Sequence, residues 1–164
     1  MKTPVSFALL ALCVGWASEC FAQSQAAPPP LPVSKVQPVL DAAAKQGKFT
    51  FIVFHKGDTA ALRSMFTVVK EGVTARSKNA VHTVADANAA GEQALVEKLG
   101  IGRAPMPLTV AIAPNGAVTG IFPKAIQDEQ LTTCIVPPTM MRCMKSLQDQ
   151  KLVFVCMTTD PNEE

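Results

Sequence analysis

The chain has 164 residues, with 15 lysines and arginines against 13 aspartates and glutamates, so its formal net charge is +2. Hydrophobic residues make up 48% of the sequence and charged residues only 17%. This balance excludes a disordered polyelectrolyte. It also argues against a nucleic-acid-binding protein, which needs concentrated positive charge. The length indicates one domain.

Residues 1–22 have the organisation of a signal peptide. Lys2 provides a positive start, an apolar run covers residues 4–16, and residues 20–22 (Cys-Phe-Ala) place small side chains where a signal peptidase needs them, before Gln23. The alternative is a membrane anchor, but the apolar run is too short to span a bilayer comfortably. We therefore expect an exported protein, periplasmic or secreted, whose mature form is not embedded in a membrane.

Removal of this segment leaves residues 23–164. Residues 23–33 are rich in proline and alanine and have no apolar periodicity, which is typical of an extended linker. The remaining cysteines are Cys134, Cys143 and Cys156. In an oxidising compartment this odd number predicts one unpaired thiol or an intermolecular bridge.

The first helix and strand have clear local signals. Ser34 and Gln37 have the spacing of a capping box, and Gly47 marks the end of the helix. The run from Phe49 to Phe54 is almost wholly β-branched or aromatic, which is typical of a strand covered on both faces. The expected buried stripe of the helix is Val36, Val39, Leu40 and Ala43.

The next elements alternate between helix and strand. Asp58 is a good N-cap for a second helix, in which Leu62, Met65, Phe66 and Val69 recur at helical spacing. Gly72 is the expected end of that helix. The remaining predicted elements are a strand over residues 80–85, a helix over 89–99, a strand over 108–113, a turn at 114–116, a strand over 117–122 and a helix over 127–135.

This order predicts an α/β fold, a three-layer α/β/α sandwich with a mixed sheet. Together with Gly100-Ile101, Pro107-Leu108-Thr109 and the Asn115-Gly116 hairpin, it resembles the thioredoxin-like superfamily over residues 34–136. The resemblance implies a cis proline before the third strand. Pro105 and Pro107 both compete for that position, and we favour Pro107 because strand register shifts less readily than loop length.

The sequence departs from that superfamily where its redox chemistry resides. The superfamily carries two cysteines, separated by two residues, at the start of the helix after the first strand, where the helix N-terminus lowers a thiol's pKa. Here the matching stretch, residues 58–61, reads Asp-Thr-Ala-Ala and contains no sulfur. Without a thiol no disulfide exchange is possible at this position. We therefore expect a binding protein rather than an enzyme, and no cofactor.

The resemblance also indicates where binding takes place. In such proteins the backbone beside the cis proline captures an extended peptide by strand-like hydrogen bonds, which needs no cysteine. The expected partner is thus a protein or extended peptide, and the expected groove residues are His55, Lys56, Gly57, Asp58, Thr59, Met106 and Pro107.

The C-terminal part, residues 137–164, resembles the opening of a second such unit. Residues 139–150 have a helical pattern and residues 151–157 are an apolar strand pattern in which Phe154 matches Phe51 of the first unit. Three explanations stay open: a truncated product, addition of the strand to the sheet of its own domain, or pairing with another copy in a homodimer. We favour packing on the same domain or on a second chain, because a lone apolar strand needs a partner.

Three other chemistries compete with peptide binding. Cys134 and Cys143 either form a disulfide across the proline pair or pack as small apolar side chains, and Cys156 is the third thiol available for a non-standard redox reaction. His55 and His82 with Asp58 form a possible zinc or acid–base set. A soft-metal site is the third alternative, although stripes of this kind are more often core: Met140, Met141, Cys143, Met144, Cys156 and Met157.

Overall fold

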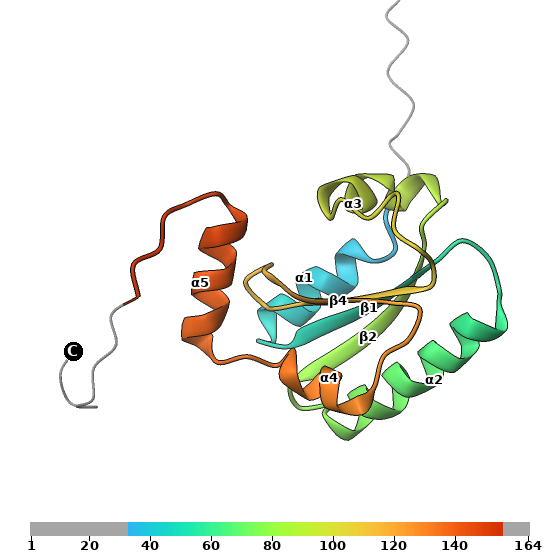
Figure 1. The fold of residues 1–164 in the computed structure, drawn as a ribbon, viewed down its shortest axis with the longest axis horizontal. Helices are drawn as coiled ribbons and strands as arrows, with labels where there is room; N and C mark the ends of the chain where they lie inside the picture. The colour runs from blue at the N-terminus through green and yellow to red at the C-terminus, as the bar shows by residue number, and fades with distance from the viewer. Residues whose placement is uncertain (1–32, 156–164) are drawn as a thin grey trace, which may run out of the picture. The chain divides into compact units, whose positions relative to one another are not determined.

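The centre of the molecule is a four-stranded mixed sheet in the order β2-β1-β3-β4 (Figure 1). The computed structural model describes residues 33–155, so the predicted signal peptide and nearly all of the predicted linker lie outside the described residues. β1 is parallel to β2 and antiparallel to β3, which is antiparallel to β4. The strands are β1 (Phe49–His55), β2 (Ala80–Asp86), β3 (Leu108–Ile112) and β4 (Val118–Pro123).

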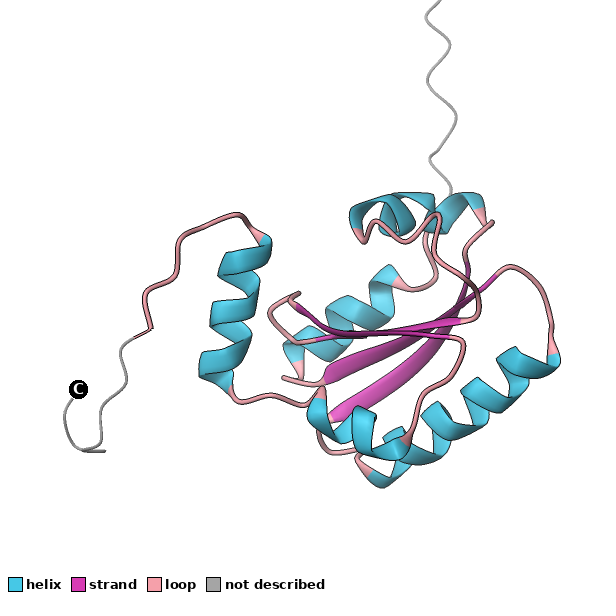
Figure 2. Cartoon of the chain, in the orientation of Figure 1, coloured by secondary structure: helices cyan, strands magenta, loops and turns pink. Residues whose placement is uncertain are grey.

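Helices cover both faces of this sheet (Figure 2). On one face lie α1 (Gln37–Lys45) and α3 (Gln93–Lys98), the latter preceded by a short 3-10 turn, η1 (Ala90–Glu92). On the other face lie α2 (Ala60–Ala75) and α4 (Asp128–Thr133). The result is the predicted three-layer sandwich. Among residues 33–155, no helix combines the length and the apolar character that a membrane span requires.

The core divides into two layers because β1 and β3 are buried on both faces. Alternate residues of these strands point to opposite faces, so Phe51 packs on the α2 side and Phe54 on the α1 side. On the α2 side Leu62, Met65 and Val69 meet the sheet at the predicted helical spacing. The prediction that β1 is covered on both faces is confirmed.

The fold is thioredoxin-like. Its mixed sheet with an antiparallel hairpin is the one expected from the resemblance. The Met106–Pro107 peptide bond is cis, so Pro107 rather than Pro105 holds the position before β3.

A buried carboxylate joins the start of α1 to η1. Glu92, whose residue is 4% exposed, accepts hydrogen bonds from Ser34 Oγ at 2.7 Å, Lys35 N at 2.7 Å and Val36 N at 3.3 Å. Ser34 Oγ in turn accepts from Gln37 N at 3.0 Å, although the N-cap residue of α1 is Val36 and not the predicted Ser34. The prediction that the Gln37 side chain completes the capping box was wrong, because this side chain donates to Asp41 on the next turn at 2.8 Å.

Two predicted helix boundaries of α2 were also wrong. Thr59, not Asp58, is the N-cap, and its Oγ1 accepts from Leu62 N at 3.1 Å. Gly72 does not end the helix, which continues to Ala75. Gly72 is instead a point of close approach, because a Cβ there would lie 2.3 Å from Leu131 Cδ1 of α4.

The C-terminal helix α5 (Pro138–Gln148) lies beside the β3–β4 hairpin. The side-chain amide of Gln148 donates to Val118 O at 2.7 Å and accepts from Val118 N at 2.9 Å, so it occupies backbone groups at the outer edge of β4. On the same helix, Met141 and Met144 pack against the α2-side core.

The predicted strand after α5 is not formed by residues 151–155, which have no regular structure. Leu152 is 89% exposed and Phe154 90% exposed, so these residues do not add to the sheet of their own domain. The sequence of these residues has the period of a strand, but a strand needs a neighbouring backbone with free N–H and C=O groups. At Val118 of β4 these groups already bond to the side chain of Gln148. Pairing with a second copy stays a prediction, and Cys156 and Met157 lie outside the described residues.

Candidate functional site

Two loops at one end of the sheet enclose a cleft of about 140 Å³. One loop follows β1, and the other precedes β3. Because β1 and β3 are antiparallel with Phe54 opposite Leu108, the same register sets His55 beside Pro107. Six of the seven residues expected in the groove line this cleft: His55, Lys56, Gly57, Thr59, Met106 and Pro107.

Local hydrogen bonds hold the two loops in place. Gly57, at φ 141°, adopts a conformation that side-chain-bearing residues rarely take, and its N–H donates to His55 Nδ1 at 3.3 Å. Lys56 Nζ donates to Gly102 O at 3.1 Å and so joins the β1–α2 loop to the α3–β3 loop. No local pattern identifies Gly102 as a partner, because only the tertiary fold brings the two loops together.

Asp58 is the expected groove residue that does not line the cleft. Its carboxylate accepts two hydrogen bonds from Arg63, at 3.0 Å to Nε and 2.7 Å to Nη2. The hydrogen bond from Arg63 lowers the pKa of Asp58 from its usual value. Asp58 therefore orders the first turn of α2 on its outer side instead of meeting a ligand in the cleft.

The cleft offers free backbone groups, and none of the described residues that line it is a cysteine. The stretch from Asp58 to Ala61 at the start of α2 has no sulfur, hence no thiol for disulfide exchange. Within residues 33–155, no hydrogen bond joins the N–H or C=O of Met106 to another residue. Such free groups beside Pro107 can pair with an extended chain, as at the edge of a sheet.

The cysteines within the described range lie away from this cleft. Cys134 and Cys143 are both free, so the disulfide weighed between them is not formed in the structure. A Cβ on Gly120 would lie 2.6 Å from Cys134 Sγ, so this thiol lies against β4 at Gly120. Gly120 is the register partner of Ala111 on β3. Four residues along β3 separate Ala111 from Pro107, or about 13 Å. Cys134 is 2% exposed, and burial raises its pKa to about 11.

We expect a thiol reagent at about pH 8 to modify Cys143 in the folded protein and to reach Cys134 only after unfolding, because burial both shields the Cys134 thiol and disfavours its thiolate. Alkylation followed by peptide mass spectrometry measures each site separately. Modification of Cys134 at the same rate as the partly exposed Cys143 would contradict the burial of the Cys134 thiol.

The structure does not bring together the alternative zinc or acid–base set of His55, His82 and Asp58. His82 pairs with Phe51 in the sheet register and His55 with Asp86, so the two histidines are four residues apart, or about 13 Å. The His82 ring contacts the Phe66 ring edge-on, with 5.6 Å between the ring centroids. Burial lowers the pKa of His82, and the nearby Lys70 lowers it further. No group of three or more metal-binding His, Cys, Asp or Glu side chains occurs in the part of the chain that the structure describes.

Two of the side chains considered as soft-metal ligands are used in packing instead. Met141 and Met144 pack against the α2-side core, whereas Met140 is 49% exposed. Thioether side chains used in packing are not free to converge on a metal ion.

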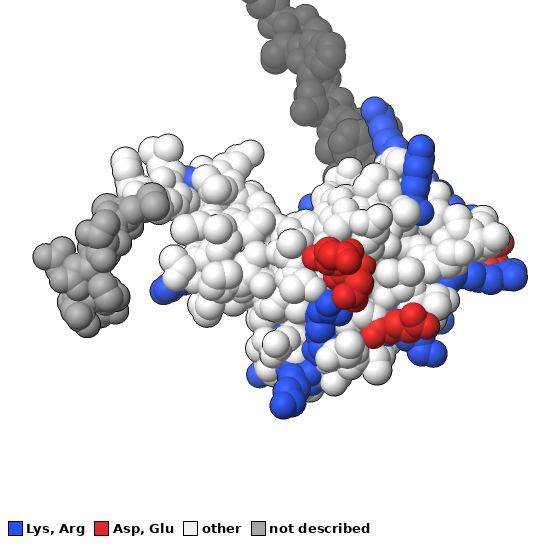
Figure 3. Space-filling view, turned by 60° about the horizontal axis from the view of Figure 1, so that its bottom comes forward, with Lys and Arg blue, Asp and Glu red and all other residues white. Residues whose placement is uncertain are grey.

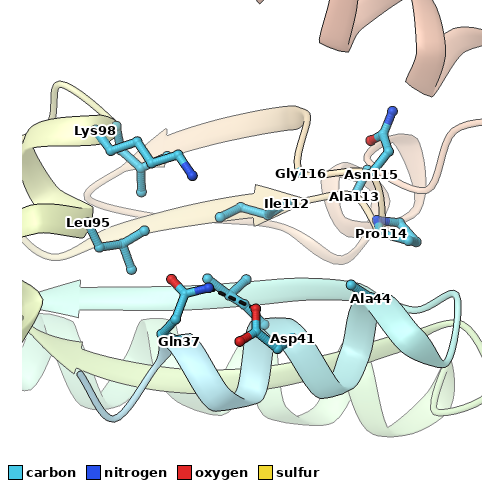
Figure 4. A pocket seen from close by; sticks show the side chains of 12 residues that line it. Gln37, Asp41, Ala44, Leu95, Lys98, Ile112, Ala113, Pro114, Asn115 and Gly116 are labelled. Carbon is cyan, nitrogen blue, oxygen red and sulfur yellow. Dashed lines mark hydrogen bonds between the residues drawn. The ribbon is translucent and has the colours of Figure 1, made fainter. Parts of the chain in front are cut away.

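A second hollow, which the sequence analysis did not anticipate, lies between α1, α3 and the β3–β4 hairpin (Figure 4). Its volume is about 280 Å³, and Leu95 and Ile112 supply apolar surface. Two of its polar side chains are paired with each other, because Gln37 donates to Asp41 at 2.8 Å. The smaller cleft is the candidate site, because the free backbone groups of Met106 lie there beside Pro107, the proline that precedes β3.

Charge is mixed over the surface. On the face that Figure 3 presents, acidic side chains lie among the basic ones. An ion pair between Arg76 and Asp128, at 2.6 Å, joins α2 to α4. The arrangement agrees with the balanced composition and not with one continuous basic surface on that face.

Comparisons with known proteins add a likeness of fold. No protein-family model matches the chain, and no curated protein matches it. Among solved structures, the chain is similar to a disulphide isomerase from Xylella fastidiosa Temecula1, with 16% sequence identity and a TM-score of 0.39, over 73% of this chain and 93% of that one. The thioredoxin-like character of the present fold rests on its own strand order and on the proline before β3.

Proposed function

We propose that this thioredoxin-like chain is an exported, non-catalytic module that binds an extended segment of another protein or a peptide. The observation that carries the proposal is the cleft between the β1–α2 loop and Met106-Pro107, where backbone groups are free and no thiol is present. An extended peptide lying along Met106 would exchange strand-like hydrogen bonds with its N–H and C=O. The side chain of Met106 and the ring of Pro107 would supply apolar contact.

The test is selection of short peptides from a random displayed library on the immobilised full chain. Met106→Trp fills the cleft with a larger side chain and is expected to weaken each selected peptide by about tenfold or more. Met140→Trp is the matched control, because it makes the same change at an exposed position of α5 and is expected to leave binding within about twofold. Amide chemical shifts are expected to change at residues 55–59 and 106.

Two results would overturn this proposal. The first is a library that yields no peptide sensitive to Met106→Trp. The second is reduction of insulin disulfides by the protein that is abolished when Cys134, Cys143 or Cys156 is changed to serine, which would favour the thiol-redox alternative. Elemental analysis of the purified protein tests the soft-metal alternative in the same preparation.

Export is the part of the proposal that depends on residues 1–22 alone. The positive start, apolar run and small residues before Gln23 support it. Mass spectrometry of the protein recovered outside the cytoplasm is expected to find a chain that begins at Gln23.

A further inference from the structure

We infer that the cleft prefers extended peptides that carry acidic side chains, an inference that rests on the proposed function. The β1–α2 loop, which lines the cleft, and two segments in contact with cleft residues each contribute one exposed cation. Lys56 lines the cleft from the β1–α2 loop. Arg103 follows Gly102, whose carbonyl Lys56 contacts. Lys124 continues the β3–β4 ladder, because its N–H donates to Pro107 O at 2.9 Å.

Carboxylates do not cancel this charge. In residues 55–59, 101–107 and 123–125 the one carboxylate is that of Asp58, and both of its oxygens are engaged by Arg63. The next acidic group, Asp86, is the register partner of His55, and its carboxylate accepts from Asn88 N at 2.9 Å. The cleft is therefore bordered by more positive than negative charge, although the whole chain is nearly neutral.

The cations are expected to make the cleft select acidic peptides over neutral ones. Side chains of an extended peptide alternate in direction, so acidic residues at alternate positions would all point toward one side of the cleft. Because Lys56, Arg103 and Lys124 are exposed, each contributes modestly and the contribution is screened by salt. Complementary charge mainly sets which partner is chosen and how fast it associates.

The experiment uses the peptides selected on the full chain. We expect them to be enriched in Asp and Glu, and we expect an acidic peptide to bind about tenfold tighter than the same peptide with Glu replaced by Gln, at about 0.02 M salt. At about 0.5 M salt the ratio of the acidic peptide's affinity to that of the Gln-substituted peptide is expected to approach one. Fluorescence anisotropy with labelled peptides measures both affinities.

Variants identify the cations responsible. Lys56→Gln, Arg103→Gln and Lys124→Gln are each expected to narrow the acidic-to-neutral affinity ratio about two- to threefold, and Lys124→Arg to preserve it. Lys45→Gln, in the last turn of α1 at the opposite end of β1, is the matched control and is expected to keep the ratio. Equal binding of acidic and neutral peptides would overturn the inference and leave the proposed function intact. Absence of any cleft-dependent peptide would overturn both.

Discussion

Replacement of Glu92 by alanine is expected to lower the free energy of unfolding by about 2–4 kcal/mol. The carboxylate of Glu92 is buried and accepts from Ser34, Lys35 and Val36, the residues that lead into α1. Alanine removes the shared acceptor of these donors and leaves Val36 N with Ser34 Oγ alone, at 3.2 Å. Val36 is itself 0% exposed, so water cannot easily replace the carboxylate. Urea unfolding followed by far-UV circular dichroism measures the loss. Circular dichroism is the suitable probe because Trp16 lies in the predicted signal peptide and the sequence has no tyrosine.

Two further variants make this prediction specific to the hydrogen bonds. Glu92→Gln keeps the shape of the side chain and one acceptor oxygen, and it is expected to lose about half as much stability. Glu97→Ala removes an exposed carboxylate from α3, the helix that follows Glu92, and is expected to change the free energy of unfolding by less than about 0.5 kcal/mol. An effect of Glu92→Ala no larger than that of Glu97→Ala would show that the link to α1 contributes little.

Replacement of Leu131 by alanine is expected to destabilise the protein by about 3 kcal/mol. Leu131 is 0% exposed and is the side chain by which α4 packs on Gly72 of α2. The surrounding strands and helices restrict collapse of the cavity, so both the transfer free energy and the packing are lost. Leu147→Ala is the matched control on α5, where the side chain is 60% exposed, and it is expected to cost less than about 0.5 kcal/mol.

The contact between α2 and α4 also predicts a coupling. Gly72→Ala alone gains helix propensity of about 1 kcal/mol but sets a Cβ 2.3 Å from Leu131 Cδ1 and 2.7 Å from Asp128 Oδ1, so it is expected to destabilise the protein. In the Leu131→Ala background the same change is expected to be about 1–2 kcal/mol less harmful. A double-mutant cycle measures this difference, and strictly additive effects would contradict the close approach of the two helices.

The loop that lines the cleft was predictable because its signals are local. An apolar strand ending at Phe54 and a proline before the third strand together identify the two segments, and the register of β1 with β3 brings them side by side. The N-cap of α2 was harder to predict. Asp58 and Thr59 are adjacent residues with similar capping propensity, and only the hydrogen bond from Leu62 N to Thr59, with Arg63 holding Asp58, distinguishes them.

Long-range packing explains the predictions that failed. Gly72 has the sequence character of a helix stop, yet it is required where Leu131 of α4 approaches α2. Residues 151–155 have the period of a strand, but periodicity cannot show whether an adjacent backbone is available. The buried role of Glu92 had no local signal, because its three donors lie 56 to 58 residues earlier in the chain.

By itself, the sequence determined the order of helices and strands, the two-sided burial of β1, the choice of Pro107 and the absence of sulfur at the start of α2. The order and the burial follow from neighbouring residues and from the period of apolar side chains. The importance of Pro107 and of the start of α2 came from the resemblance to the thioredoxin-like superfamily. Only the tertiary structure decided that Asp58 turns away from the cleft, that Cys134 is shielded against β4 and that Lys56 joins two loops. Each of these depends on the meeting of segments far apart in the sequence, whose geometry is set by packing rather than by local preference.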